Sequence, residues 1–456
     1  MRLLAIAALA GGCADALPSA REQRVIDELA NDNYIWGLRD PQLVALKLRK
    51  MQRGPYEWLR GTASLYWRDL TEPGGGRMTT AFGDPASSRV LLVGDPHPEN
   101  VGTFRAADGT MLCDWNDLDA AGYGPFTADV RRLAVGMIVA AASDDAYADE
   151  LAARVAAGYT SEIAALGTGA APFTIGAGAH PMLDKVLAKA QSRGEVRFAV
   201  DELAPISDGQ RYVAFGDLEP IAADGLYEDT LLPVGAEPAV WIDSVIAQWA
   251  ARRGEPAVVK LRARRIGAGV SSYPALRYDV ILEGPTPMPG DDEIVELKEE
   301  RDGHVLHGLP QYSAAEWNSP AARAVDAQRR LQTRRDADPR LGWGDLGGLS
   351  LKIRDREAYQ RGLDHLDMAA LAAGSASKRA QLGDLAELLG RLLASAHGNA
   401  RTEDGVLGVT VIAPVLAGRE AAFSDELVAG ARAEAAQVIA DHASLQDADL
   451  AARVIR

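Results

Sequence analysis

The feature that most constrains this chain is an apolar run that ends abruptly in a polar loop. Residues 90–93 (VLLV) are short enough for a buried strand. Residues 94–100 (GDPHPEN) hold two prolines in three positions, which excludes a regular helix or central strand and predicts a fixed loop. After a turn at residues 107–109, a second short strand (111–113) leads into residues 114–119 (DWNDLD). Two loops thus present carboxylates and an Asn, which can hold a hard cation and accept a proton from a hydroxyl.

Two simpler interpretations of this segment compete with a functional one. Acidic loops are common in a chain of net charge −16, and clusters of Asp, Asn, Gly and Pro usually form turns. The spacing of the polar residues is, however, more particular than a turn requires. An EF-hand is a poor fit, because the loop lacks the alternating ligands, the Gly at the sixth position and the Glu at the twelfth.

The pattern Gly-Asp-x-His-x-x-Asn, followed by an apolar strand that ends in Asp, resembles the catalytic and metal loops of the protein-kinase-like superfamily. The closest variants are those of aminoglycoside and choline phosphotransferases. The resemblance implies that Asp95 orients or deprotonates the acceptor hydroxyl, and that His97 lies where those small-molecule kinases also carry a His. It further implies that Asn100 and Asp114 hold Mg2+ on the phosphates of ATP, with Asp117 as another candidate metal ligand.

The flanking sequence narrows the resemblance. Asp129 matches an Asp that braces the catalytic loop in that superfamily. Residues 54–63 (GPYEWLRGTA), the proline-containing loop and residues 114–134 together resemble one bacterial family, catalogued as domain of unknown function 2252, an uncharacterised kinase-like group. The similarity runs from about Lys47 to about Asp441, which is most of the chain. No activity follows from the family name, so the residues must carry the argument.

A second informative segment, residues 258–299, reads as strand, Gly-containing turn, strand, loop and strand. This is the order of the nucleotide-binding lobe of kinases. In that lobe Gly267, Gly269 and Ser271 would lay backbone amides over the phosphates of ATP, and Lys298 would contact them. Simpler explanations stay open. A Gly-x-Gly is weak evidence in a chain with 45 glycines, and an exposed Lys on a strand is as common as a ligand.

Residues 320–334 are predicted to form the next helix. In a kinase this helix supplies a Glu that pairs with the strand Lys. The matching position here is Asp326, which is one methylene shorter and leaves that ion pair open. Arg60, on a predicted helix over residues 58–70, is either a surface residue or a contact to phosphate or carboxylate, since a guanidinium fork suits both.

The order of these parts predicts the architecture. In ordinary kinases the Gly-rich loop and Lys precede the catalytic Asp, whereas here Lys298 follows Asp95. The sequence therefore predicts an α+β, protein-kinase-like, two-lobe fold that is circularly permuted and has a helix-rich larger lobe. The helix that ends near His397 would lie beside the strand leading to Asp95, which is tolerable because chain termini often lie close together. The predicted parts are residues 1–20, a signal peptide and linker; 21–255, the N-terminal helices, catalytic and metal loops and helical lobe; 256–355, the nucleotide lobe; and 356–456, the helices that complete the larger lobe.

Composition limits the partners. The chain has 456 residues with 48 basic and 64 acidic side chains, which argues against a nucleic-acid-binding surface. Its two cysteines, Cys13 and Cys113, provide neither a disulfide framework nor a zinc site. A single Arg, a short apolar run and Gly11-Gly12-Cys13 resemble a bacterial lipoprotein signal. This predicts a cell-envelope protein attached to the membrane only through a lipidated Cys13. The alternative is a cytoplasmic protein with an apolar tail.

Three functions remain in view. The first is an ATP- and Mg2+-dependent phosphotransferase whose partners are a nucleotide and a small-molecule or protein acceptor, with small molecules slightly favoured. The second is a non-catalytic, pseudokinase-like lipoprotein that binds a ligand, which export would favour because ATP is scarce outside the cytoplasm. The third is a metal-dependent phosphoester hydrolase that uses Asp95, His97, Asp114 and Asp117.

Overall fold

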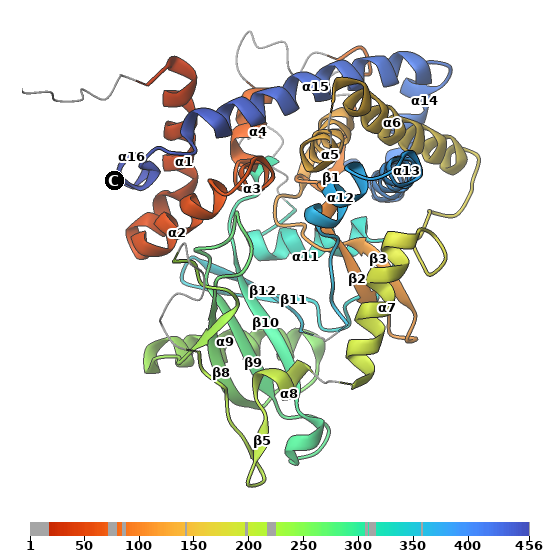
Figure 1. Cartoon of the computed structure of the whole chain (residues 1–456). Coiled ribbons are helices and arrows are strands. Elements are labelled where there is room, and N and C mark those ends of the chain that lie inside the picture. Colours follow the sequence, from red (N-terminus) through yellow and green to blue (C-terminus); the bar gives the residue numbers. More distant parts are fainter. Residues whose placement is uncertain are drawn as a thin grey trace, which may run out of the picture.

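The computed structural model describes residues 18–71, 80–83, 88–141, 144–196, 199–216, 225–305, 309, 316–356 and 359–455. It confirms the α+β class: most helices gather in one part of the molecule and a six-stranded antiparallel sheet dominates the other (Figure 1). The predicted signal peptide with Cys13 lies outside the described residues. Within the described ranges, no helix is both long enough and apolar enough to cross a membrane.

The helices and strands of the described residues follow one another in an irregular order. The helices are α1 (Ala20–Arg39), α2 (Pro41–Met51), α3 (Pro55–Gly61), α4 (Ala63–Leu70), α5 (Phe126–Ala141), α6 (Asp145–Gly167), α7 (Pro181–Val196), α8 (Ala199–Leu203), α9 (Ala236–Arg253), α11 (Pro320–Leu331), α12 (His365–Ala372), α13 (Ala376–Asn399), α14 (Gly408–Leu416), α15 (Glu420–Leu445) and α16 (Leu450–Val454). The strands are β1 (Arg89–Leu92), β2 (Val101–Arg105), β3 (Met111–Trp115), β4 (Gly122–Pro125), β5 (Ile206–Ser207), β6 (Gln210–Arg211), β7 (Thr230–Leu232), β8 (Val259–Ile266), β9 (Arg277–Leu282), β10 (Glu293–Glu300), β11 (Gly342–Leu346) and β12 (Leu349–Asp355).

The large sheet has the strand order β11-β12-β10-β9-β8-β7, with every neighbouring pair antiparallel. Because side chains alternate along a strand, its two faces differ. Tyr278, Val280, Leu297 and Ile353 are buried in one apolar cluster with α9. The opposite face carries charged side chains of β9, β10 and β12 and turns toward the polar loops. The sheet also includes β7 and packs on α9, both of which precede the predicted boundary at residue 256.

The helical part draws on both ends of the chain. α13 packs on α6, and α15 packs on α5, α6 and α3, so the long C-terminal helices lie across the N-terminal ones in Figure 1. The predicted proximity of the helix near His397 to the strand leading to Asp95 is confirmed, because α13 contacts β1.

Two small sheets position the polar loops. β1 pairs with β4, and β2 pairs with β3, both antiparallel. The linking segment (residues 359–363), which follows β12, adds to the edge of β2: the N–H of Thr103 donates to the carbonyl of Arg361 at 2.7 Å. The segment that follows β12 is therefore tied to the β2–β3 hairpin, which leads into the acidic loop.

Most predicted helices and strands are present, with two differences. The single helix expected over residues 58–70 is two helices, α3 and α4, because the chain breaks at Gly61-Thr62. There the hydroxyl of Thr62 donates to the carbonyl of Trp58, and Gly61 lets α3 approach Met51 of α2. For residues 194–254 the sequence predicts a helix over 241–252 and otherwise loops, whereas the structure contains α8, β5 to β7 and the longer α9.

Candidate functional site

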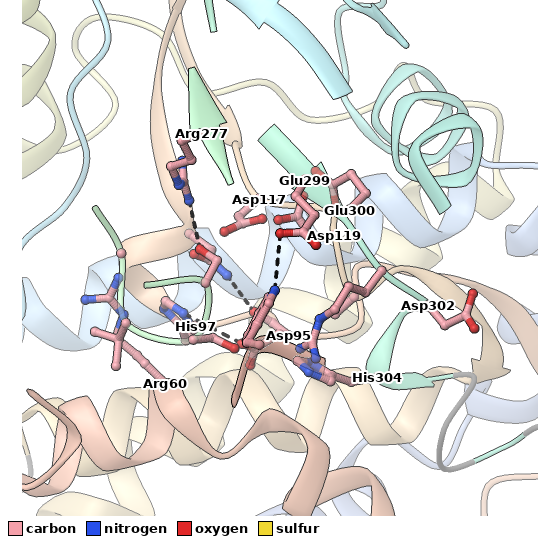
Figure 2. Close-up of a pocket in the computed structure, with 18 residues that line it drawn as sticks. Arg60, Asp95, His97, Asp117, Asp119, Arg277, Glu299, Glu300, Asp302 and His304 are labelled. Atoms are coloured by element: carbon pink, nitrogen blue, oxygen red, sulfur yellow. Dashed lines mark hydrogen bonds and ion pairs between the residues drawn. The ribbon is translucent and has the colours of Figure 1, made fainter. Parts of the chain in front are cut away.

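The polar loops and the charged face of the large sheet enclose a cavity of about 110 Å3. Its lining comes from α1, α3, the loop before β2, the loop after β3, the turn between β8 and β9, and the end of β10. Figure 2 shows Asp95 and His97 in one wall and Asp117, Asp119 and Arg277 in another. Segments that are far apart in sequence therefore deliver their polar side chains to one place.

The loop that carries Asp95 is held from beneath by α5. The Asp129 carboxylate accepts the backbone N–H groups of Val93 at 2.8 Å and of Gly94 at 3.2 Å, and is completely buried. The Nε2 of His397 lies 3.1 Å from the same carboxylate. Gly94 has φ +88°, and a Cβ there would lie 2.3 Å from the carbonyl oxygen of Ala120, so no other residue fits. The bracing role expected for Asp129 is confirmed.

Asp95 lies at the bottom of the cavity with one oxygen engaged. Its Oδ1 accepts from Nε of Arg132 at 2.8 Å, and Arg132 also donates to the carbonyl of Leu59. Its Oδ2 lies 4.0 Å from Nε2 of His97. A carboxylate fixed on one side and open on the other is suited to orient a hydroxyl, because the free oxygen can accept its hydrogen.

His97 is almost completely buried beside Asp95. Its Nδ1 lies 3.4 Å from the hydroxyl of Tyr56. Burial lowers the pKa of His97 to about 4, although the nearby charge of Asp95 opposes the shift. The imidazole is therefore neutral at physiological pH; its hydrogen-bond contact is with Tyr56, and it lies beside Asp95 without a hydrogen bond to it.

Asn100 and Asp117 face the cavity with oxygen atoms available. The amide nitrogen of Asn100 donates to the carbonyl of Asp95 at 2.9 Å, which turns its side-chain oxygen outward. That oxygen has no partner among the described residues. The Oδ1 of Asp117 is buried and accepts no hydrogen bond from them, although the Lys298 ammonium lies 3.5 Å away. Two oxygen ligands thus lie next to the Asp95 loop.

Lys298 reaches the acidic loop from β10. Its ammonium contacts the carboxylate of Asp119 in addition to Asp117, and Lys352 on the neighbouring β12 binds the other oxygen of Asp119 at 2.6 Å. Burial alone would raise the pKa of Asp117, but Lys298 and Lys352 hold it below its usual range. Burial lowers the pKa of Lys298, opposed by Asp117 and Glu300. The two lysines and two aspartates form a compact charged cluster.

Asp114 does not reach the cavity, which corrects its expected role as a metal ligand. Its Oδ2 accepts from the N–H and the hydroxyl of Thr333, at 2.8 and 2.6 Å, and its Oδ1 from the N–H of Trp115. Burial raises the pKa of Asp114 to about 6. The difference follows from their positions: Asp114 lies within β3, where it binds Thr333, whereas Asp117 lies in the loop after β3 and lines the cavity.

Asp326 does not pair with Lys298, which corrects a second expectation. Its carboxylate binds Nη1 of Arg330 at 2.9 Å, one turn along α11, and accepts from the indole of Trp317 at 3.0 Å. The side chain of Asp326 is 41% exposed. The carboxylates that Lys298 uses come instead from the loop after β3.

The turn between β8 and β9 is placed as expected, but its glycines differ in role. Gly269 and Ser271 line the cavity, whereas Gly267 does not. A Cβ on Gly267 would lie 2.5 Å from the carbonyl oxygen of Tyr227, so this glycine serves the packing of the turn. The hydroxyl of Ser271 has no partner within the described ranges, so it is free to meet a ligand.

Arg60 lines the cavity and also holds the loop. Its Nη1 binds Glu99 at 2.6 Å, and the other Glu99 oxygen accepts from Nδ1 of His365 at 2.7 Å. Burial would raise the pKa of Glu99, but His365 and Arg60 lower it to about 2. Arg60 therefore has a structural role in its ion pair with Glu99, and it also lines the cavity.

Several residues of the site escaped sequence reasoning. Arg323 on α11 donates to the carbonyls of Asp119, Ala121 and Arg301, at 2.6–2.8 Å, and so clamps the acidic loop to the end of β10. The sequence could have indicated Arg132, because it lies one helical turn after Asp129 and on the same face of the helix. No local pattern could have indicated the contact between Lys352 and Asp119, because it joins residues 233 positions apart.

The residues fit a divalent cation and phosphates in part. Asn100 and Asp117 offer oxygen atoms of the type that Mg2+ prefers, and the orphaned Oδ1 of Asp117 lacks the partner that a cation would provide. Gly269 and Ser271 line the cavity and could contact phosphates, whereas Lys298 does not line it and lies behind Asp117 and Asp119, which it contacts. Asp114 and Gly267 belong to the supporting structure.

Comparison with known proteins identifies the family. The model of the family described as "Uncharacterized protein conserved in bacteria (DUF2252)" matches residues 39–448. The chain belongs to this family. No curated protein and no solved structure matches it. The DUF2252 match includes every residue that lines the cavity except Trp36 of α1, so the cavity lies almost entirely within the matched region.

Proposed function

We propose that this DUF2252 protein is a nucleotide-dependent phosphotransferase with a circularly permuted, kinase-like arrangement. The single observation that carries the proposal is the convergence of Asp95, Asn100, Asp117 and the Gly269–Ser271 turn on one cavity, with Lys298 against Asp117. The order β8, turn, β9, β10 with Lys298, and then α11 supports it, because kinases place the Gly-rich loop, the Lys strand and the next helix in that order.

The residues have distinct tasks in this proposal. Asp95, held by Arg132, accepts the hydrogen of an acceptor hydroxyl and orients the oxygen for in-line attack on the γ-phosphoryl. Neutral His97, in contact with the hydroxyl of Tyr56, lies 4.0 Å from the free Asp95 oxygen and borders the place of the acceptor hydroxyl. Asn100 and Asp117 would hold Mg2+, which neutralises phosphate charge when bound. Lys298 and the turn amides stabilise the charge that develops on the transferred group.

Transfer of labelled phosphate from ATP tests this proposal. Purified protein is incubated with γ-labelled ATP, Mg2+ and fractionated bacterial metabolites. We expect Asp95→Asn to lower the rate by about 10²–10⁴-fold, the usual share of a positioned acid or base. Asp326→Asn is the matched control and should retain the wild-type rate, since its carboxylate points to Arg330.

Three results would contradict the proposal. Equal rates for Asp95→Asn and wild type would remove Asp95 from the chemistry. Release of phosphate from a simple phosphoester with metal but without nucleotide would instead identify a hydrolase. Absence of any Mg2+-dependent stabilisation by ATP would support the non-catalytic alternative.

A further inference from the structure

A second cavity also borders the charged face of the sheet, at the place where Arg354 of β12 meets the linking segment. It has a volume of about 180 Å3 and is bordered by Thr103, Asn116, Arg354, Gln360 and Arg361. Among the residues that the structure describes, no Asp or Glu lines it. This composition is unusual for a chain with net charge −16, and it makes the cavity a positively charged compartment.

The guanidinium groups in this cavity have unused donors. Arg354 gives Nη2 to Glu296 at 3.0 Å, and its Nε is buried without a partner in the described part of the chain. Arg361 donates from Nη1 to the carbonyl of Gln360, and its Nη2 is buried and likewise unpaired there. Unpaired buried donors cost free energy, so two arginines with this property in one cavity indicate a missing anionic partner.

The charge balance around Arg354 agrees with this interpretation. Glu296 is completely buried and is the common partner of Arg265, Arg277 and Arg354, at 2.6–3.0 Å. One carboxylate therefore serves three guanidinium groups. For Arg361, burial and the positive charges of Arg193 and Arg356 lower the pKa, and the negative charge of Glu202 opposes the shift only in part.

Asn116 and the linking segment, which border the cavity, pack closely on β2. A Cβ on Gly102 of β2 would lie 2.2 Å from the side-chain nitrogen of Asn116 and 2.9 Å from the carbonyl of Arg361. Asn116 and the linking segment thus cover β2, and the side chain of Asn116 has no hydrogen bond to any described residue. With a volume of about 180 Å3, the cavity has room for one small group such as a phosphate.

We propose that this cavity is an oxyanion subsite that binds a phosphate group through Arg354, Arg361 and the amide of Asn116. A guanidinium fork presents parallel N–H donors that match phosphate oxygens. The subsite adjoins the proposed catalytic cavity, because Asn116 precedes Asp117 and because Glu296 contacts both Arg277 and Arg354. It binds either a phosphate of the bound nucleotide or a phosphate of a separate small molecule, and it exists whether or not the protein transfers phosphate.

Calorimetric titration with inorganic pyrophosphate in the absence of divalent metal tests the subsite. We expect saturable binding that weakens with added salt and that falls by about tenfold or more in Arg361→Gln, since a charge-assisted hydrogen bond is lost. Arg361→Gln should fold normally, as the side chain bonds only to its neighbouring carbonyl. Arg154→Gln, an exposed arginine on α6, is the matched control and should bind like wild type.

Further measurements distinguish the possible sources of the phosphate and separate this inference from the proposed function. Competition between ATP and pyrophosphate would assign the subsite to the nucleotide, and simultaneous binding would assign it to a separate molecule; both support an oxyanion subsite. Asp95→Asn should keep pyrophosphate binding even if transfer is lost. No metal-free binding by wild type, or equal binding by wild type and Arg361→Gln, would overturn the inference.

Discussion

The two faces of the six-stranded sheet differ sharply in the side chains that they bury. One face buries aliphatic and aromatic side chains against α9. The other carries a ladder of arginines, lysines and carboxylates that is also largely buried. Burying charges costs much more than burying apolar groups unless each charge is paired. A sheet that served only as scaffold would be more stable with two apolar faces, so the charged face points to a ligand.

The two faces also differ in how their buried side chains find partners. On the α9 face, contact area alone suffices, and Leu297 and Val295 have no exposed surface. On the charged face the pairing is uneven. Glu296 has three guanidinium partners, while both oxygens of buried Asp279 accept no hydrogen bond within the described ranges. Burial therefore raises the pKa of Asp279. Uneven pairing is what a binding surface shows before its ligand is present.

The largest expected effect comes from Glu296→Gln. Removing this charge leaves three buried guanidinium groups without their shared counter-ion, so we expect a loss of about 3–5 kcal/mol in the free energy of unfolding. Urea denaturation measures it. Glu293→Gln, on the same strand, is the control: its carboxylate is 35% exposed and bound to Arg340, so a loss of at most about 1 kcal/mol is expected. Similar losses in the two variants would contradict the special role of the charged face.

Leu297→Ala probes the adjacent residue on the opposite face. We expect a loss of about 2–5 kcal/mol from the lost burial and the cavity left behind. The conservative Leu297→Met should lose less than about 1.5 kcal/mol. Neither change should alter binding of pyrophosphate or of Mg2+ with ATP. If Leu297→Ala changed ligand affinity at temperatures where it stays folded, the two faces would not be independent.

Asp117→Asn and Asp114→Asn sharpen the comparison within the acidic loop. Asp117 faces the cavity, whereas Asp114 is bound to Thr333. At ligand concentrations near one hundred times the dissociation constant, wild type should gain about 2.7 kcal/mol from ATP and Mg2+. Thermal denaturation should show that Asp117→Asn loses most of this gain and that Asp114→Asn keeps it. The reverse result would restore Asp114 as the metal ligand.

The smallest expected effect is the pH dependence contributed by His97. Burial holds the pKa of His97 at about 4 in the folded protein, whereas the unfolded chain binds a proton near pH 6.5. Stability from the neutral imidazole is therefore complete above about pH 6.5 and is lost as the pH falls toward about 4. Between pH 7 and pH 5, wild type should lose about 2 kcal/mol more than His97→Gln. Equal losses in urea denaturation would place His97 in a solvated environment.

Local patterns made much of the fold predictable. The alternation in β9 and β10, the proline-bounded loop after β1 and the Ala-rich helices α5 and α6 all follow from residues close in sequence. The Asp95 loop and the position of Lys298 on its strand are present for the same reason, whereas the bracing role of Asp129 was implied by the resemblance to the kinase-like superfamily. A pattern of period two even separates the faces of the sheet, because residues at odd and even positions must point in opposite directions.

Only the tertiary structure decided which carboxylates meet Lys298 and which metal-ligand candidate faces the cavity. Asp114 and Asp117 are three residues apart and chemically alike, and the choice between them depends on Thr333, more than two hundred residues downstream. Lys298 likewise contacts Asp117 and Asp119 and not Asp326, because the loop after β3 folds under β10. Side-chain chemistry and periodicity are local properties of a chain. The partner of a buried charge is set by how distant elements pack, and no local pattern contains that information.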